Sequence, residues 1–245
     1  MSTVELVAMT VFPLALLAAT IDVIAGFARF GVATAWVVLL WPLGVVGAAL
    51  ATGFLHVVAD NFGDEKTPLL GPAFVFRFRQ HHEHPGIICT LSFRELNAPA
   101  ITLCTPILLV LALWVPTDTT RWGLAATSTG VVFLVFGAFT NQIHRFAHAR
   151  RPCHPIIRAL QRSGLLLRPE HHAVHHRAPH DVHFSITNGW LDPWLDRTGA
   201  WHLAARMLVA LGARQAPESV LGPSGRAGRD CCALRHRDTL WPGAG

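Results

Sequence analysis

Histidine is the residue type in this chain with the clearest potential for chemistry. The chain has 15 histidines among 245 residues, and several of them stand in four separated groups with one aspartate. The groups are His56-x3-Asp60, His81-His82, His144-x3-His148 and His172-x2-His175-His176. On a helix, residues three or four positions apart lie on one face, one turn from each other. The spacing therefore predicts that the imidazoles within each group point towards a common place.

Converging imidazoles indicate bound metal. Without an ion, six or more of them facing one another would repel on protonation and leave polar atoms unsatisfied. Imidazole binds iron, zinc, copper and nickel, so the ligand type alone leaves the metal open. A catalytic zinc needs three protein ligands and a structural zinc needs four. Eight histidines and one carboxylate in four groups therefore fit two metals better than one.

Other common catalytic arrangements are missing from the sequence. The five cysteines form no C-x-x-C pair, which argues against a thiolate zinc site or a disulfide framework. There is no H-E-x-x-H pattern, which a zinc-dependent hydrolase of that type would carry. Tyrosine is absent, so no tyrosine acts as acid, base or radical.

The elements that must position these histidines are apolar. The chain is 51% hydrophobic and 14% charged, with a mean hydropathy of +0.39, whereas soluble domains carry about 25% charged residues. A helix needs about 20 apolar residues to cross a bilayer core, and four stretches come close to that length: 5–27, 33–58, 98–115 and 124–139. The first is also compatible with a cleaved signal peptide, although no Lys or Arg precedes it.

Basic residues predict the orientation of these spans. The loop at 60–96 and the segment after the fourth span are rich in Lys and Arg, whereas the two opposite loops carry only Arg29 and Arg121. Because positive loops stay in the cytoplasm, we expect both termini and every histidine group on that side. The net charge of +5 then indicates attraction to anionic lipid headgroups rather than to nucleic acid. The predicted fold class is an all-α, multi-pass membrane bundle of about four transmembrane helices with a cytoplasmic, histidine-rich di-metal cap.

The remaining chain divides into two interfacial segments and a tail. Segments 156–168 and 194–211 carry apolar residues at near-helical spacing among basic or aromatic ones. They could lie flat on the membrane or pack against the domain's own core. After residue 213 the chain is rich in Gly, Pro, Arg and Ser. We expect a membrane domain at 1–213 and a disordered tail at 214–245.

Two histidine-rich metals beside an apolar bundle suggest oxidative attack on a buried alkyl chain. Side chains cannot activate an isolated C–H bond, so a metal cofactor must do so. A metal transporter is the alternative from another class. Transport sites lie near the bilayer midplane, whereas these histidines cluster at one boundary, which favours the enzyme.

Several motifs, in order, resemble one family of lipid desaturases. The motifs are Leu55-His56-x3-Asp60-Asn61-Phe62-Gly63-Asp64, Thr67-Pro68, Phe78-Arg79-Gln80-His81-His82, Phe139-Thr140-Asn141-Gln142-x-His144-x3-His148, His172-x2-His175-His176, Pro179-His180 and Ile186-Thr187-x-Gly189-Trp190-Leu191. Across residues 50–200 the chain is similar to the plasmanylethanolamine desaturases, which make the vinyl ether bond of plasmalogens. A related branch includes the plant plastid enzyme that desaturates palmitate on phosphatidylglycerol.

The resemblance implies a set of metal ligands. Carried over by motif, the ligands are His56, Asp60, His81, His82, His144, His148, His172, His175 and His176. Further candidates, as ligands or as groups that hold the ligands, are His84, His171, His180, His183, Asn141, Asp64 and Asp181. Where family members often have His or Arg after the His-His pair, this chain has Leu91, and His84 is a candidate replacement. His183 stands where the family usually has Tyr.

The resemblance also implies an activity. We expect an oxidoreductase with two iron ions that uses O2 as co-substrate and takes electrons from a cytochrome b5 or a ferredoxin. Its substrate would be a membrane lipid, most simply a plasmanylethanolamine-type ether lipid desaturated at the first two carbons of the sn-1 alkyl chain. The alternative within the same chemistry is an acyl-chain desaturase or hydroxylase.

Overall fold

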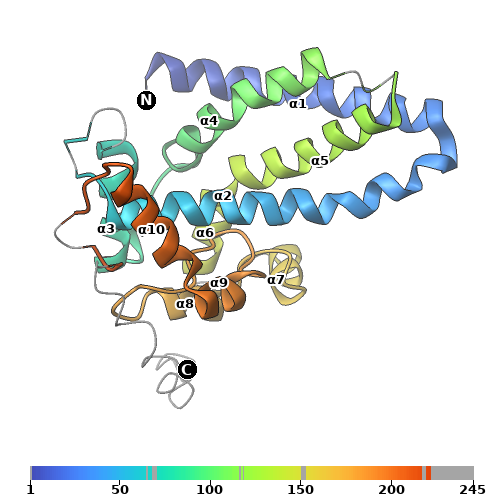
Figure 1. Ribbon diagram of the computed structural model, residues 1–245. Coiled ribbons are helices and arrows are strands. Elements are labelled where there is room, and N and C mark those ends of the chain that lie inside the picture. Colours follow the sequence, from blue (N-terminus) through green and yellow to red (C-terminus); the bar gives the residue numbers. More distant parts are fainter. Residues whose placement is uncertain are drawn as a thin grey trace.

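Helices make up the framework of the protein, as a computed structural model shows (Figure 1). The structure describes residues 2–64, 66–67, 71–115, 117, 119–149, 153–216 and 219–221. Within these ranges there is no β-strand, only an isolated bridge between Phe62 and Gln215, so the all-α prediction is confirmed. In chain order the elements are α1 (Thr3–Phe30), η1 (Gly31–Leu40), α2 (Trp41–Asn61), η2 (Gly71–Val75), α3 (Phe76–Glu83), η3 (Ile87–Cys89), α4 (Phe93–Trp114), α5 (Arg121–Ala138), α6 (Thr140–His148), α7 (Pro155–Arg162), α8 (Pro169–His175), α9 (Asp192–Thr198) and α10 (Ala200–Ala210).

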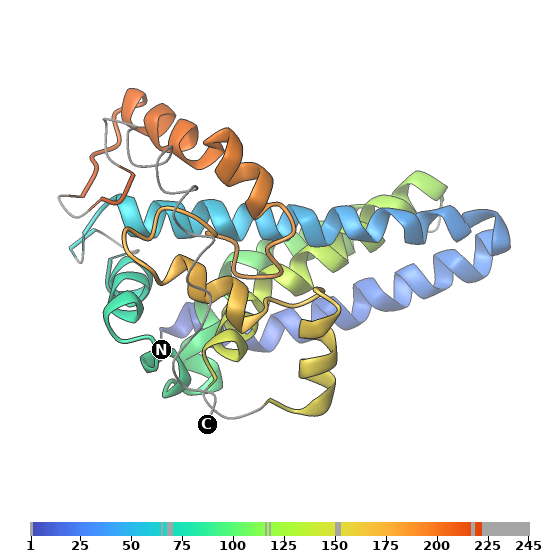
Figure 2. The same ribbon diagram turned by 90° about the horizontal axis from the view of Figure 1, so that it is seen from below.

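Three helical runs in the described chain are long and apolar enough to cross a membrane: Thr3–Asn61, Phe93–Trp114 and Arg121–Ala138. The sequence predicted four separate spans, but its first two are joined here in one run of 59 residues through η1. Figures 1 and 2 show that this run turns back at η1, so that α1 and α2 point in opposite directions. At 1.5 Å per residue the 21 residues of α2 reach about 32 Å, enough for a bilayer core.

Helices α4 and α5 form the middle of the bundle. Helix α1 packs on α4 and α5, while α2 packs on α5. Phe12, Leu108 and Leu134 are buried in the core between α1, α4 and α5. The contact between α2 and α5 depends on Gly44, since a Cβ there would lie 2.5 Å from the carbonyl oxygen of Thr129. Small residues allow this close approach, as is common between membrane helices.

The shorter helices α3, α6, α8, α9 and α10 gather at one end of the bundle, where α2 and α5 end (Figures 1 and 2). We call this group the cap. Helix α6 begins at Thr140, directly after α5 ends at Ala138, so its histidines lie within three turns of an apolar helix. The N-terminus lies at the same end of the molecule as the cap (Figure 1).

The first segment expected at the interface contains most of α7, and the second contains most of α9 and all of α10. Trp201 and Ala205 of α10 are buried in a core that includes Val57 of α2, whereas Leu203 and Met207 on the same helix are exposed. In α7, Ile157 packs against buried residues and Ile156 is exposed. Each helix therefore has one apolar face in the core and further apolar side chains outside it.

The ordered fold continues past the boundary that we expected at residue 213. The Oγ atom of Ser219 and the backbone N–H of Leu221 both donate to Oδ1 of Asn61, each at 2.8 Å. Leu221 itself is buried against the end of α2. The structure therefore ties residues 219–221 to the bundle, and the rest of the predicted tail, 222–245, lies outside the described residues.

Candidate metal centre

Two groups of potential ligands meet in the cap. Cluster 1 is His56, Asp60, His82 and His175, and cluster 2 is His81, His144, His148, His172 and His176. Within each cluster the ligand atoms all lie within 4.8 Å of one another. All nine residues for which the sequence predicted a ligand role therefore come together, and each belongs to one of the two clusters.

The histidine doublets divide between the clusters. Neighbouring residues on a helix point about 100° apart, so His81 and His82 of α3 face different clusters. His175 and His176 at the end of α8 do the same. The rings of His82 and His176 are 5.2 Å apart, centroid to centroid, and those of His175 and His176 are 5.7 Å apart. Helices α3 and α8 thus serve both clusters and hold them side by side.

In cluster 2, the Nε2 atoms converge on that of His172. The distances from His172 Nε2 are 2.7 Å to His144, 2.9 Å to His148 and 3.1 Å to His176. A neutral imidazole carries a single N–H, so hydrogen bonds between the rings cannot satisfy all four nitrogens. Nitrogens bound to one ion at about 2.1 Å lie roughly 3 Å apart. The arrangement fits a shared cation.

In cluster 1, histidines surround a buried carboxylate. The Nε2 atoms of His56, His82 and His175 lie 3.3, 3.5 and 3.7 Å from the carboxyl oxygens of Asp60. Among the described residues, neither Asp60 oxygen nor His56 Nε2 has a hydrogen-bond partner. Buried polar atoms rarely lack a hydrogen-bond partner. A cation among these four side chains would satisfy them. A set of imidazoles with a carboxylate suits iron and related transition metals.

Backbone carbonyls fix the orientation of three ligand rings. Nδ1 of His56 donates to the carbonyl oxygen of Phe184 at 2.9 Å, and Nδ1 of His175 donates to that of Val182 at 2.8 Å. Nδ1 of His81 makes the same kind of contact with Phe78. Because a carbonyl only accepts, the proton is on Nδ1 and the Nε2 lone pair points into the cluster. This is the usual tautomer arrangement of a metal-bound histidine.

The cluster histidines are neutral at pH 7. Burial lowers the pKa of His148 to about 4. Burial, together with neighbouring imidazoles, lowers the pKa of His82 to about 2 and that of His176 to about 3. The same causes place the pKa values of His144 and His172 well below the ordinary value. Metal binding requires neutral imidazole, so these rings are ready to bind without losing protons.

His171 and His183 form a third group, with Asp192. His171 Nε2 donates to Oδ2 of Asp192 at 2.7 Å, and the His183 ring stacks on His171 with centroids 4.1 Å apart. Asp192 also accepts from Ser185 Oγ at 2.6 Å. A Cβ at Gly189 would lie 2.3 Å from His171 Nε2, so only glycine leaves room for this ring. These contacts satisfy the polar atoms directly and anchor α8.

The remaining predicted residues lie at different distances from the clusters. The ring of His180 is 4.7 Å from that of His82, and its Nδ1 donates to the carbonyl oxygen of His175 at 2.9 Å. Asn141 donates to the carbonyl oxygen of Leu96 at 2.9 Å and joins α6 to α4. Asp181 is buried within the cap. Of these three, His180 lies beside a ligand ring of cluster 1, and the supporting roles of Asn141 and Asp181 stay predictions.

The structure does not bring His84 or Asp64 to the clusters. His84 is exposed at the end of α3 and so does not replace a ligand at position 91. Asp64 is exposed in a turn, where its Oδ1 accepts from the N–H of Lys66 at 2.8 Å. Leu91 belongs to neither cluster, and its carbonyl oxygen accepts from Nη1 of Arg145 at 3.1 Å.

Sequence reasoning missed two arginines that brace the ligand-bearing elements. Arg79 donates to the carbonyl oxygens of Ala59, Phe62 and Gly63 at the end of α2, beside Asp60. Arg145, between the two histidines of α6, donates to the carbonyl oxygen of Cys89 at the end of η3. Backbone carbonyls carry no sequence signal, so neither role could be predicted.

The pattern of the lipid desaturase domain matches residues 45–219, which is more than half of the chain and contains both clusters. The chain belongs to the lipid desaturase domain family. The resemblance seen in the sequence motifs is therefore confirmed, and the family's matched range coincides with α2, the cap and the helices that connect them.

Curated relatives carry desaturase names. Plasmanylethanolamine desaturase 1 of Mus musculus is 36% identical over 176 residues, covering 69% of this chain and 65% of its own length. Plasmanylethanolamine desaturase of Myxococcus xanthus is 32% identical over 168 residues, covering 68% and 58%. Fatty acid desaturase 4, chloroplastic, of Arabidopsis thaliana is 33% identical over 158 residues, covering 63% and 46%. The chain thus spans less than two thirds of the length of each relative. No solved structure matches it significantly.

Proposed function

We propose that this chain is an O2-dependent di-iron desaturase that introduces the vinyl ether double bond into a plasmanylethanolamine-type lipid. The observation that carries the proposal is the pair of adjacent clusters at the end of an apolar bundle. Eight histidines and one carboxylate match the number and type of ligands that two iron ions need. The relatives named plasmanylethanolamine desaturase support the choice of substrate.

When bound, the two irons would supply the O2 activation and oxidising power that no side chain has. Overall, two hydrogens leave adjacent carbons of the alkyl chain and a C=C bond forms. O2 takes up four electrons and four protons to give two waters. Two of these electrons and two of the protons come from the lipid, the other two electrons come from a donor protein, and the other two protons come from solvent. We propose a cytochrome b5 or a ferredoxin as this donor.

The protein itself would hold the irons and the lipid chain in place. Cluster 1 would hold one iron and cluster 2 the other, with the carbonyls of Phe184 and Val182 keeping the rings of His56 and His175 in place. Four of the ligands are at most 2% exposed and are therefore shielded from water: His56, His144, His172 and His175. A dry site that fixes the chain beside the metals favours attack on carbon over side reactions.

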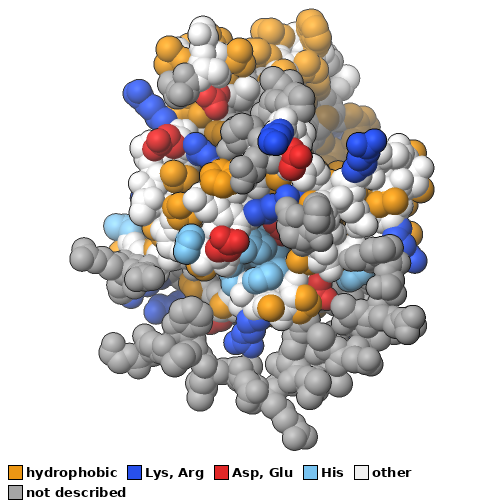
Figure 3. Space-filling view, turned by 90° about the vertical axis from the view of Figure 1, so that its left-hand side faces the viewer, with side chains coloured by type: hydrophobic (Ala, Val, Ile, Leu, Met, Phe, Trp, Pro, Cys, Tyr) orange, Lys and Arg blue, Asp and Glu red, His pale blue; other side chains and the backbone are white. Residues whose placement is uncertain are grey.

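We further propose that the bundle crosses the membrane four times, with α1 and α2 as separate spans, and that the cap faces the cytoplasm. The apolar side chains on the outer faces of α1 and α4, such as Leu14 and Leu103, are exposed, as lipid-facing residues would be. Figure 3 views the cap end and shows histidine side chains near the centre of that face, with Lys and Arg around them. A soluble electron donor could approach there.

The test is lipid analysis of a host that lacks vinyl ether lipids. Cells that express the wild-type chain and receive a 1-O-alkyl ethanolamine phospholipid should form the acid-labile vinyl ether product. The His144→Ala and His175→Ala variants should form none. His202→Ala is the matched control, because His202 lies on α10 outside both clusters. Product formation by His144→Ala would contradict the proposal.

The alternative is desaturation of an acyl chain by the same centre. The relative named fatty acid desaturase 4, chloroplastic, favours it. The same experiment separates the two, because an acyl double bond survives the acid treatment that cleaves a vinyl ether.

A further inference from the structure

A cavity of about 260 Å3 lies against cluster 2, with walls from α3, η3, α4 and α6. Its lining is mostly apolar and includes Phe78, Ile88 and Leu96. His81 and His144 also line it and are almost fully buried, so they mark its inner end. Ligand pockets usually measure about 300–1,000 Å3. This cavity is therefore large enough for only part of a two-chain lipid.

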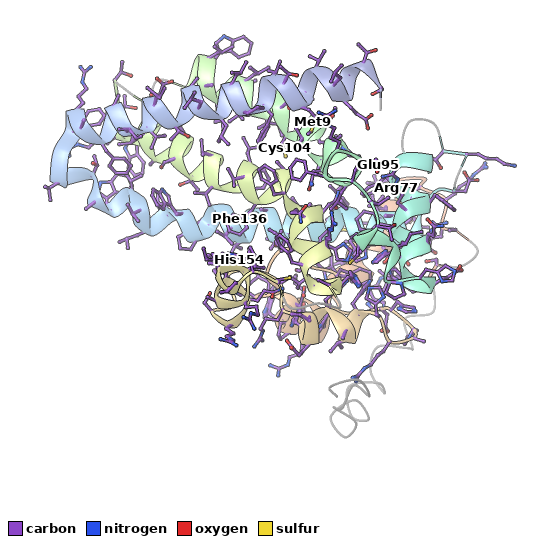
Figure 4. All side chains as sticks on the ribbon, turned by 180° about the vertical axis from the view of Figure 1, so that it is seen from behind. Met9, Arg77, Glu95, Cys104, Phe136 and His154 are labelled. Atoms are coloured by element: carbon purple, nitrogen blue, oxygen red, sulfur yellow. The ribbon has the colours of Figure 1, made fainter. Side chains whose placement is uncertain are left out.

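An arginine and a glutamate line the outer part of the same cavity. Arg77 is half-buried and Glu95 is exposed. Figure 4 shows the two residues next to each other, between α3 and the start of α4. Arg77 Nη1 donates to the carbonyl oxygen of Glu95 at 2.8 Å, which holds the guanidinium at this place. The Glu95 carboxylate is fixed as well, since it accepts from the backbone N–H of Ser92 at 2.9 Å in a capping box.

Both charged groups retain atoms for a ligand. Within the described chain, Nε and Nη2 of Arg77 and Oε1 of Glu95 make no hydrogen bond. A guanidinium is suited to a phosphate through two parallel hydrogen bonds. A neighbouring carboxylate would repel a purely anionic headgroup but attract an ammonium group. The pair therefore matches a zwitterion that carries both.

The spacing on α3 indicates which carbons reach the metals. Arg77 and His81 are four residues apart, so they lie on one face about 6 Å from each other along the helix. In a 1-O-alkyl glycerophospholipid the phosphorus and the first alkyl carbon are separated by about six bonds of roughly 1.5 Å each. Extended as a zigzag, that span is about 7–8 Å, similar to the separation of the two residues along the helix. A carbon in the middle of the chain would lie far beyond it.

From this geometry we propose that the cavity is the site of the reacting end of the substrate. Arg77 binds the phosphate and Glu95 binds the ammonium of a zwitterionic ethanolamine phospholipid, while the first carbons of its sn-1 chain lie beside His81 and His144. The rest of the chain passes along Pro99 and the exposed side chains of α4 towards the bilayer. The inference rests on the proposed function for the identity of the reaction, but the binding site can be tested separately.

The binding test uses the iron-loaded protein in lipid nanodiscs without O2, so that the probe binds but does not react. The probe is an ethanolamine phospholipid with a diazirine close to the ether oxygen of its sn-1 chain. After illumination, mass spectrometry should find the label on residues 87–99, and Arg77→Gln should reduce it about tenfold, as expected for the loss of a charge-assisted contact. Arg94→Gln is the matched control, because Arg94 is exposed and does not line the cavity. Equal labelling of wild type and Arg77→Gln, or labelling confined to α1 and α5, would overturn the site.

The headgroup test uses Glu95→Gln. Glutamine preserves the capping box with Ser92, so this change removes the charge while it keeps the start of α4. Wild type should favour ethanolamine over glycerol headgroups in the same cross-linking assay, and Glu95→Gln should reduce that preference about tenfold. An unchanged preference would overturn the role of Glu95. Wild-type protein that binds the probe here but forms no vinyl ether would refute the proposed function and leave this site intact.

Discussion

Replacing Asp192 should destabilise the cap more than any exposed substitution. Asp192 is fully buried and accepts from His171 Nε2 at 2.7 Å and from Ser185 Oγ at 2.6 Å. Alanine would leave both donors unpaired inside the protein. Hydrogen bonds to a charged group contribute about 1.5–3 kcal/mol each, and breaking a buried ionic network typically costs about 3–5 kcal/mol. We therefore expect Asp192→Ala to lose about 3–5 kcal/mol, whereas Asn, which keeps one acceptor oxygen, should lose less.

The assay is thermal unfolding in detergent with iron analysis of the same samples. For a chain of this size, the loss corresponds to a fall in Tm of about 10 °C. Because His171 lies next to His172 on α8, the iron content should fall as well. Glu170→Gln is the control, since Glu170 is exposed on the same helix. If Asp192→Ala unfolds within 1 °C of wild type and keeps its iron, Asp192 does not anchor α8 and the reasoning is refuted.

The other predictions concern the ligands and the bundle. His82→Ala should reduce iron from two to about one per chain, because cluster 1 loses one of its four ligands, while His84→Ala should leave metal analysis unchanged. Equal iron in both variants would contradict the ligand assignment. Gly44→Ala should destabilise the bundle by about 1–3 kcal/mol in thermal unfolding, because the new Cβ meets the Thr129 carbonyl oxygen at 2.5 Å. Gly86→Ala, with open space around it, is its control, and equal Tm values for the two would contradict the close α2–α5 contact.

Much of the candidate site could be predicted from sequence because its signals are local. The pairs His56/Asp60 and His144/His148 have helical spacing, and each follows or ends an apolar stretch, so both their shared face and their position at the end of the bundle could be predicted. The division of the His81-His82 doublet between two clusters also follows from helix geometry.

Other features depend on contacts that have no local pattern. Asp192 is 21 residues from His171 and meets it only because the chain folds back on itself, so nothing in the sequence singled it out. The carbonyls of Phe184 and Val182 orient two ligands, yet every residue has a carbonyl. The expected supports included Asp64, which turned out to cap an exposed turn.

Two features of the bundle could not be predicted from the sequence either. Hydropathy found the apolar stretches but could not show that the first two form one helical run through η1, because a chain reversal without a polar loop has no hydropathy signal. The tail was expected to leave the fold at residue 213 from its composition, whereas Asn61 binds Ser219 and Leu221 through a single side-chain oxygen.

The central claim is that two irons are held side by side by clusters 1 and 2. Its most direct test is the metal content of the protein purified from iron-supplemented cells, with Mössbauer spectroscopy of an iron-57 sample. We expect two irons per chain with the signature of a coupled pair, and loss of that coupling in His175→Ala. Zinc in place of iron, or a single isolated iron in the wild type, would contradict it.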